Sequence, residues 1–301
     1  MGARLARVPE WSPEIVVDEP LARRLLGKQF PELELAALRL AGEGWDNTAW
    51  LVDERWLFRF PRREIALAGV RRELRVLPAL APLLPLPIPQ PAFVGRPSSE
   101  FPWPFFGGPV VPGCELAEAR LSDDARSALA RPLGRFLRAL HAAEIPVELP
   151  VDPISRADMC FRVPRARERL AELRYSDPRA DAVLAAGLEL PPPERFALVH
   201  GDLHIRHVFV DDGRLSGVID WGDVCRSDPA VDLVLVWCAL PPAARPAFFE
   251  EYGQVGEDSL LRARVLSLFL CAVLALHARA EGLVDVERES LDGLERTLAG
   301  S

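Results

Sequence analysis

Short runs in which apolar and polar residues alternate are common along the first hundred residues, and they predict β-strands. The alternation is clearest on either side of Asp53-Glu54, a short turn that would join two strands as a hairpin. Successive side chains of a strand point to opposite faces, so Arg59 falls on the face opposite to Phe58 and Phe60. The expected strands are Glu34–Ala41, Thr48–Val52, Arg55–Phe60, Ala92–Gly95 and Phe101–Phe106.

Apolar residues recur every three or four positions in later segments, which is the pattern of an amphipathic helix. In Glu64–Leu80 this pattern places Leu67, Val70, Leu74 and Leu77 on one face. Further helices are expected from Asp18, from Ser122 to about Ala143, and at Phe161–Leu173, Pro178–Gly187, Pro241–Tyr252, Ser259–Glu281 and Val286–Ala299. Two short strands are expected among these helices, Val208–Val210 and Gly217–Ile219, around the turn Asp211-Asp212-Gly213.

The change from strands to helices along the chain predicts an α+β fold with two lobes, a β-rich N-lobe and a helical C-lobe. The stretch 107–113 is rich in Gly and Pro and is typical of a linker. We therefore expect an N-terminal lobe at 1–107, a hinge at 108–114 and a C-terminal lobe at 115–301. A cleft between two such lobes is a natural site for a small molecule.

Composition narrows the class of protein. Hydrophobic residues make up 49% of the chain and charged residues 27%, as in soluble globular proteins. A net charge of −8 argues against a nucleic-acid partner, which would need a basic face. The five cysteines are scattered without a C-x-x-C pair, as in proteins of a reducing compartment. The N-terminus lacks the apolar core of a secretory signal, and no uninterrupted apolar run reaches the ~18 residues that span a bilayer. We expect a cytoplasmic protein without a membrane partner, either a monomer or a weak dimer.

The candidate chemistry lies in LVHGDLHIRHVFVDDGRLSGVIDWGD, which holds three of the five histidines within eight residues. Asp202 is followed five residues later by His207 and eighteen residues later by Asp220. Carboxylates placed around a tight hairpin can converge on one point. Mg²⁺ prefers carboxylate oxygens, and a carboxylate held off the metal can accept a proton from a substrate hydroxyl. A zinc site of the metalloprotease kind is disfavoured, because no helical Glu base and no cysteine stand at ligand spacing.

The motif H-G-D-x-x-x-x-H followed by I-D-W-G-D resembles the aminoglycoside phosphotransferase family, small-molecule kinases with a protein-kinase-like fold. The resemblance covers nearly the whole chain. The stretch GEGWDNTAWLV is similar to the family's nucleotide-covering loop, and WLFRFPRR is similar to its third strand. RRELRVLPAL is similar to its αC-type helix, and DPAVDLV is similar to the segment that follows its metal-binding Asp. The ordered set is specific, whereas any single piece would be weak.

The resemblance implies a role for each matching position. Asp202 would be the catalytic base, and Asp220 would hold Mg²⁺ on the phosphates of ATP or GTP. Arg59 would bind phosphate oxygens and pair with Glu73. The other positions that it implies for nucleotide binding are Gly44, Trp45, Asp46 and Asn47 in the covering loop, and Pro109, Val110 and Val111 at the hinge.

One position departs from the usual pattern, because His207 stands where the family commonly has an Asn metal ligand. Macrolide phosphotransferases, a branch of the same family, are similar in this respect. A neutral imidazole can ligate Mg²⁺ but suits softer ions such as Mn²⁺ better. We expect His207 to be a metal ligand. We expect His200 to be structural, His204 to be an exposed loop residue, and Asp232 to cap or anchor the helix that follows it.

These features predict a phosphotransferase that moves the γ-phosphate of ATP or GTP to a hydroxyl of a small molecule, most simply an aminoglycoside-type antibiotic. The acidic C-terminal helices would suit ammonium groups, although such faces are commonly just solvated surface. A macrolide 2'-phosphotransferase, with its acceptor near the apolar Val265–Leu276, and a metabolite kinase of the same fold stay open. A nucleotide-binding pseudokinase is an alternative of another class, against which both retained aspartates argue.

Overall fold

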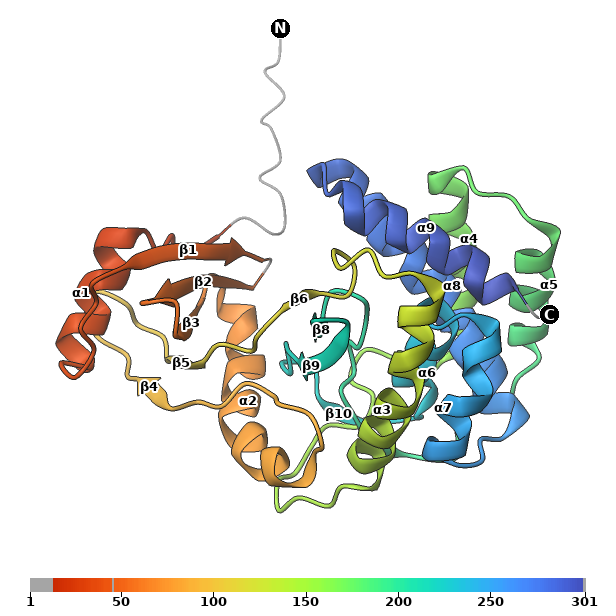
Figure 1. Ribbon diagram of the computed structural model, residues 1–301, viewed down its shortest axis with the longest axis horizontal. Coiled ribbons are helices and arrows are strands. Elements are labelled where there is room, and N and C mark those ends of the chain that lie inside the picture. The colour runs from red at the N-terminus through yellow and green to blue at the C-terminus, as the bar shows by residue number, and fades with distance from the viewer. Residues whose placement is uncertain (1–12, 45, 300–301) are drawn as a thin grey trace, which may run out of the picture. The chain divides into compact units, whose positions relative to one another are not determined.

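The structure, a computed structural model, describes residues 13–44 and 46–299. Trp45 and residues 1–12, where no secretory signal is expected, therefore lie outside the described residues. The described chain forms two compact units (Figure 1). The first holds the residues up to Pro78 together with Pro89–Val110, and the second holds Ala79–Ile88 together with the residues from Val111 onward. The expected α+β class is confirmed, with an antiparallel sheet in the first unit and mostly helices in the second.

A five-stranded antiparallel sheet in the order β1-β2-β3-β5-β4 forms the first unit. Its strands are β1 (Leu38–Glu43), β2 (Asn47–Val52), β3 (Trp56–Pro61), β4 (Phe93–Gly95) and β5 (Phe105–Pro109). The hairpin expected at Asp53-Glu54 joins β2 to β3. The expected strand Phe101–Phe106 is displaced toward the C-terminus, because Phe101 closes a turn in which its carbonyl accepts the Ser98 N–H at 2.8 Å.

Aromatic packing fixes which face of β3 is inside the first unit. Phe58 and Phe60 are fully buried, and the ring of Phe60 stacks on Phe105 with centroids 4.5 Å apart. Helix α1 (Glu19–Gln29), capped by Asp18, covers this cluster with Leu25 and Leu26. The alternation of the strand then places Arg59 on the other face, as the sequence predicts.

Helix α2 (Leu67–Leu80) follows a short 3₁₀ turn (Glu64–Ala66) and covers most of the predicted Glu64–Leu80 helix. It ends at Leu80, as predicted, with Pro78 inside its last turn. A second 3₁₀ turn, Ala81–Leu83, begins a proline-rich connector to β4. Within the second unit this connector is held by the N–H of Val218, which donates to the carbonyl of Pro87 at 3.0 Å.

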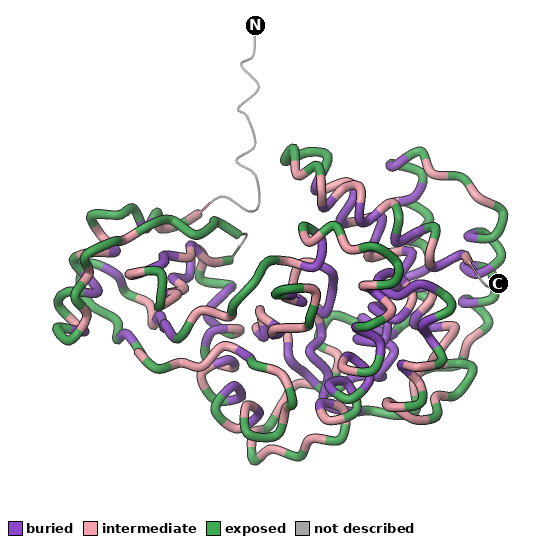
Figure 2. The backbone as a smooth tube through the Cα atoms, in the orientation of Figure 1, coloured by how far each residue is buried: buried purple, intermediate pink, exposed green. Residues whose placement is uncertain are grey.

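Helices make up most of the second unit. They are α3 (Asp123–Ala142), α4 (Met159–Leu173), α5 (Pro178–Leu188), α6 (Ala230–Cys238), α7 (Arg245–Tyr252), α8 (Glu257–Glu281) and α9 (Val284–Leu298), with a 3₁₀ turn at Pro242–Ala244. Ser122 caps α3 as expected, accepting the Ala125 N–H. The bounds of helix α6 could not be predicted from periodicity: its sequence, AVDLVLVWC, is apolar on nearly every side, so it shows no amphipathic period, and it is buried (Figure 2).

Helix α8 is the central helix of the second unit, and it packs against α4, α5, α6 and α9. It is long and apolar enough to cross a membrane by length and composition alone, although no apolar run of that length was expected from the sequence. More than half of that apolar window is buried against the neighbouring helices. Most of Val265–Leu276, considered above as the lining of a macrolide pocket, is core in this helix, with Val265, Leu268 and Ala272 fully buried.

Two small sheets support the loops that carry the predicted chemistry. Strands β6 (Cys114–Glu115), β8 (Val208–Asp211) and β9 (Arg214–Val218) form one, and β7 (Ala197–Val199) pairs with β10 (Cys225–Ser227) in the other. The expected hairpin between β8 and β9 is confirmed, with Asp212 and Gly213 in the left-handed conformation of a tight turn. The HGD loop, defined here as His200–His207, runs from β7 to β8.

Candidate active site

The HGD loop leaves the buried strand β7 through a glycine that no other residue could replace without strain. Gly201 has φ +90°, and a Cβ there would lie 2.3 Å from the carbonyl oxygen of Asp223. The close approach brings the segment after Asp220 against the backbone next to Asp202. The sequence therefore needs glycine in the HGD motif so that these two segments can pack together.

His200 holds the loop from inside the second unit. Its Nε2 donates to the carbonyl of Ile219 at 2.9 Å, and its Nδ1 accepts the N–H of Asp202 at 3.2 Å. The ring is fully buried, and burial lowers the pKa of His200 to about 4. This neutral imidazole links the residue before Asp220 to the backbone of Asp202, which agrees with the structural role expected for it.

Asp232 anchors the same loop from α6. Its carboxylate accepts the N–H of His200 at 2.7 Å and the N–H of Gly201 at 3.1 Å. The same carboxylate lies 3.1 Å from Nε2 of His141 on α3, and Nδ1 of His141 lies 2.7 Å from the hydroxyl of Tyr252 on α7. The expectation that Asp232 caps or anchors its own helix missed this network, although a carboxylate inside an apolar run is a signal that buried donors surround it.

Asp202, His207 and Asp220 lie side by side in the second unit. Nδ1 of His207 donates to the backbone carbonyl of Asp202 at 2.8 Å, and Nε2 of His207 lies 3.5 Å from Oδ2 of Asp220. Asp220 has φ +65°, an uncommon backbone conformation that costs on the order of 1 kcal/mol for a residue with a Cβ. The predicted base and the two predicted metal ligands are therefore brought together.

The protonation of Asp202 depends on opposing influences. Burial raises the pKa of the Asp202 carboxyl, and the adjacent His207 opposes that change. Because 38% of the Asp202 side chain is exposed, water screens much of this effect. The carboxylate is thus accessible to a ligand, while its backbone is fixed by His200 and His207.

His204 does not occupy the exposed position expected from the sequence. It is 7% exposed, and its ring stacks on that of His207 with centroids 3.7 Å apart. Burial lowers the pKa of His204 well below its usual range, so the ring is neutral. Its Nε2 lies 3.7 Å from Oδ2 of Asp202. The pattern of polar residues in a loop could not show that this one faces inward.

Two arginines complete the surroundings of the loop. Arg206 pairs with Glu115 of β6 at 2.9 Å. Arg156, which the sequence analysis did not single out, donates to Asp223 at 2.5 Å. Its Nη1 is buried and has no hydrogen-bond partner among residues 13–44 and 46–299. Arg156 therefore offers a donor beside the segment that follows Asp220.

In the first unit, Arg59 of β3 and Glu73 of α2 form an ion pair at 2.5 Å. Glu73 is almost fully buried, whereas 13% of the Arg59 side chain is exposed. The guanidinium also lies 5.9 Å from the ring centroid of Phe106. A buried carboxylate that fixes a partly exposed cation on a sheet can hold it ready for an anionic ligand.

The predicted nucleotide-covering loop is a tight turn between β1 and β2. The N–H of Gly44 donates to the carbonyl of Asn47 at 2.9 Å, and the Asp46 carboxylate pairs with Arg63. Oδ1 of Asn47 is buried and lacks a hydrogen-bond partner in the described part of the chain. At the predicted hinge, Pro109 ends β5, and the N–H of Val110 donates to the carbonyl of Arg55 at 3.0 Å. Val111, the third predicted hinge residue, begins the second unit.

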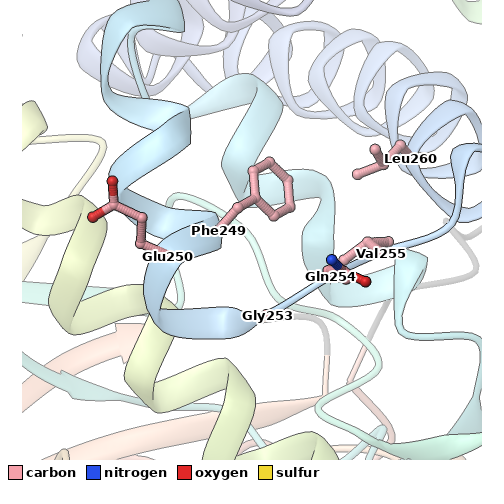
Figure 3. A pocket seen from close by; sticks show the side chains of 6 residues that line it. All are labelled: Phe249, Glu250, Gly253, Gln254, Val255 and Leu260. Atoms are coloured by element: carbon pink, nitrogen blue, oxygen red, sulfur yellow. The ribbon is translucent and has the colours of Figure 1, made fainter.

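A separate surface pocket lies where α7 ends and α8 begins (Figure 3). It is lined by Phe249, Glu250, Gly253, Gln254, Val255 and Leu260. Figure 3 shows the ring of Phe249 directed toward the side where Leu260 and Val255 lie, with the Glu250 carboxylate pointing away. None of the predicted site residues lines this pocket, so it is not part of the candidate active site.

A sheet with an internal Arg–Glu pair, followed by a helical unit with aspartates on loops, defines a kinase-like phosphotransferase fold. The family model of the phosphotransferase enzyme family matches residues 37–266, and the chain belongs to this family. A solved complex of APH(2")-IIIa with GDP and kanamycin is similar over 93% of this chain and 99% of that chain, with a TM-score of 0.69 and 25% identity.

Two further relatives extend the comparison. The fold is also similar to that of the macrolide 2'-phosphotransferase MphH from Brachybacterium faecium, with a TM-score of 0.61 and 24% identity over 92% of this chain and 98% of that one. The uncharacterised protein YcbJ of Bacillus subtilis (strain 168) is 38% identical over 61 residues. That match spans 20% of this chain and 20% of the length of YcbJ.

Proposed function

We propose that this protein transfers the γ-phosphoryl group of ATP or GTP to a hydroxyl group of a small molecule. The observation that carries the proposal is that Asp220 lies beside Asp202 and His207, which belong to the HGD loop fixed by Asp232. Membership of the phosphotransferase enzyme family and the GDP bound to the similar APH(2")-IIIa support it.

In the proposed reaction, the hydroxyl oxygen of the acceptor attacks the γ-phosphorus and the bond to the β-phosphate bridging oxygen breaks. The hydroxyl proton passes to the carboxylate of Asp202, and the nucleoside diphosphate leaves. Such a transfer depends mostly on positioning and on neutralising charge. The two backbone anchors of the loop, at Asp232 and at His207, serve the positioning of Asp202.

The donor set near Asp220 fits a divalent cation, Mg²⁺ or Mn²⁺. Asp220 supplies hard carboxylate oxygens, and the Nε2 of His207 is left with a lone pair because its Nδ1 donates to a carbonyl. When bound there, the cation would neutralise phosphate charge. The protein residues that would hold it are His207 and Asp220.

We assign nucleotide binding to the first unit. Arg59, fixed by Glu73, would neutralise phosphate oxygens. The turn that contains Gly44, Asp46 and Asn47, together with Trp45, would cover the phosphates with backbone groups and the Asn47 amide. Pro109, Val110 and Val111 would meet the purine edge, chiefly through carbonyls, because the Val110 N–H already has a partner. In this assignment residues 1–107 are the nucleotide lobe, 108–114 the hinge and 115–301 the acceptor lobe.

We propose an aminoglycoside-type antibiotic as the acceptor. Kanamycin is bound to the similar APH(2")-IIIa, and the helices that would meet an acceptor are acidic. A macrolide is the second candidate, favoured by His207 but not by α8, whose apolar residues are mostly core. The site residues Asp202, His207 and Asp220 would also fit a kinase that acts on a metabolite. We place the protein in the cytoplasm as a monomer or weak dimer without nucleic-acid or membrane partners.

The test is phosphoryl transfer by the purified full chain, with ATP or GTP and with Mg²⁺ or Mn²⁺. Acceptors are a panel of aminoglycosides, macrolides and small amino alcohols, and the readout is a product mass increased by one phosphate. Asp202→Asn should abolish transfer while nucleotide binding persists, and Asp212→Asn, in an exposed turn, is the matched control. A fully active Asp202→Asn variant, or bound nucleotide without transfer to any acceptor, would overturn the proposal and favour a pseudokinase.

A further inference from the structure

His204 is a buried histidine that the proposed phosphoryl transfer does not use. One ligand atom from each of Asp202, His204 and His207 lies within 4.8 Å of the other two. The sequence disfavoured a zinc site because the spacing matched no metalloprotease pattern. Spacing alone could not show that two stacked imidazoles face one carboxylate.

The ring of His207 is oriented as metal-ligating histidines usually are. Its Nδ1–H donates to a backbone carbonyl, that of Asp202, at 2.8 Å. This bond fixes the tautomer and leaves the lone pair on Nε2 for a ligand. In the structure Nε2 faces Asp220 at 3.5 Å, so the ring must turn before this nitrogen can reach an ion held by Asp202.

The donor spacing is close to that of a tetrahedral site. Bonds of about 2.0–2.2 Å to nitrogen and oxygen place neighbouring donors about 3.4 Å apart. Nε2 of His204 lies 3.7 Å from Oδ2 of Asp202, and the rings of His204 and His207 are 3.7 Å apart at an angle of 30°. Because a metal ion lies in the plane of each imidazole that binds it, these stacked rings must rotate apart before one nitrogen of each can point at the same ion.

We propose that Asp202, His204 and His207 bind a transition-metal ion of the Zn²⁺ or Co²⁺ class. Two imidazole nitrogens and one carboxylate favour such ions over Mg²⁺, which prefers oxygen. Three protein ligands leave a position for water. This donor set differs from His207 and Asp220, proposed above for the catalytic cation, because it includes His204 and the carboxylate of Asp202. Binding at this site does not depend on the proposed function.

Binding also requires a change of tautomer at His204. Its Nδ1 accepts the N–H of Arg206 at 3.2 Å, so the ring proton is on Nε2 in the neutral form. Coordination through Nε2 moves that proton to Nδ1 and gives up one long hydrogen bond. No net proton is released by this exchange of tautomers, and the carboxylate of Asp202 binds in its ionised form.

The experiment is titration of the metal-free full chain with Co²⁺, followed by its visible absorption, and with Zn²⁺, followed by calorimetry. We expect one saturable site per chain and an absorption typical of low-coordinate Co²⁺ that excess Mg²⁺ does not remove. His204→Gln should weaken Zn²⁺ binding by at least the 10- to 100-fold typical of altering residues that merely support metal ligands. The matched control is His277→Gln on α8, which should bind as the unaltered chain does.

His207→Asn provides a second variant, because Asn lacks the imidazole nitrogen that the site needs. It should also lose the Co²⁺ absorption, and thermal unfolding of each variant shows that it is folded. The proposal would be overturned if both variants matched the unaltered chain in Zn²⁺ affinity and Co²⁺ absorption. It would also be overturned if the chain had no saturable site. Loss of Co²⁺ binding in both variants of a chain that transfers no phosphate would support this site while the proposed function fails.

Discussion

The carboxylate of Asp232 on α6 accepts the backbone N–H of His200 at 2.7 Å, so a buried side chain holds the start of the HGD loop. The other carboxylate oxygen accepts the N–H of Gly201. These amides follow the end of β7, and the side chain of Asp232 accepts both of them. The position of Asp202 therefore depends on a residue thirty positions along the chain.

Replacing Asp232 with Asn should destabilise the protein. The amide retains a single acceptor oxygen, so one buried loop N–H is left unpaired, at a cost of about 2 kcal/mol in the free energy of unfolding. Phosphoryl transfer should fall as well, because Asp202 is no longer fixed. Urea unfolding and transfer rates check this against Asp212→Asn. If Asp232→Asn matched that control in both measurements, the loop would not depend on Asp232.

The stability of the protein should decrease with acid because His200 is buried in its neutral form. Burial lowers the pKa of His200 to about 4, whereas an unfolded histidine titrates near about 6.5. The stability that neutral His200 contributes is fully present above its pKa in the unfolded chain. It is lost as the pH falls toward its pKa in the folded protein. The full loss is about 3 kcal/mol. His204, whose pKa is also lowered, acts in the same direction.

Urea unfolding at about pH 7.5 and at about pH 5 measures this loss, which should be about 2 kcal/mol for His200 over that interval. His200→Gln removes the titrating group, so the difference between the two pH values should shrink by that amount. An unchanged difference in the variant would show that His200 is not the group responsible.

Glu73→Gln should weaken both the first unit and its proposed nucleotide site. Removing one partner of a buried ion pair leaves Arg59 without the carboxylate that faces it, at a cost of about 3 kcal/mol. The KM for the nucleotide should rise, because the guanidinium is no longer held in place. Glu64→Gln, at an exposed position ahead of α2, is the control for charge. Equal KM values and equal unfolding free energies in the two variants would contradict a role for the pair.

Sequence periodicity predicted those parts of the fold in which one face of an element is buried. The alternation in β3 placed Arg59 opposite to the aromatic core, and the cap at Ser122 marked the start of α3. The same logic failed at α6, which is buried on every side and therefore has no polar face to set a period.

Some residues of the candidate site could be predicted from the sequence, and others could not. Motif spacing located Asp202, His207 and Asp220, because residues close in sequence form that part of the site. Asp232 reaches the loop, and Arg156 reaches Asp223, from elsewhere in the chain, and such contacts leave no local pattern. His204 was misplaced because a polar residue in a loop is exposed by default, whereas here its ring packs on His207.

Zn²⁺ should inhibit phosphoryl transfer if both proposals hold, because the ion would engage the Asp202 carboxylate that accepts the hydroxyl proton. His204→Gln should then resist Zn²⁺, with an inhibitory concentration raised by about tenfold or more. Transfer assays across a Zn²⁺ series, with His277→Gln as control, check this. Equal sensitivity of the two variants would place the inhibition outside the His204 cluster.

His207 should also set the metal preference of the reaction. Its Nε2 faces Asp220 at 3.5 Å, and a nitrogen donor favours Mn²⁺ over Mg²⁺ relative to an all-oxygen site. We therefore expect Mn²⁺ to support transfer at least as well as Mg²⁺.

His207→Asn replaces the nitrogen with an amide oxygen, so the ratio of kcat/KM with Mn²⁺ to kcat/KM with Mg²⁺ should fall. A tenfold fall corresponds to about 1.4 kcal/mol of transition-state stabilisation. Water-proton relaxation measures Mn²⁺ binding without turnover, and His277→Asn controls for the loss of a histidine elsewhere. A ratio that His207→Asn leaves unchanged, with Mn²⁺ bound as before, would remove His207 from the metal site.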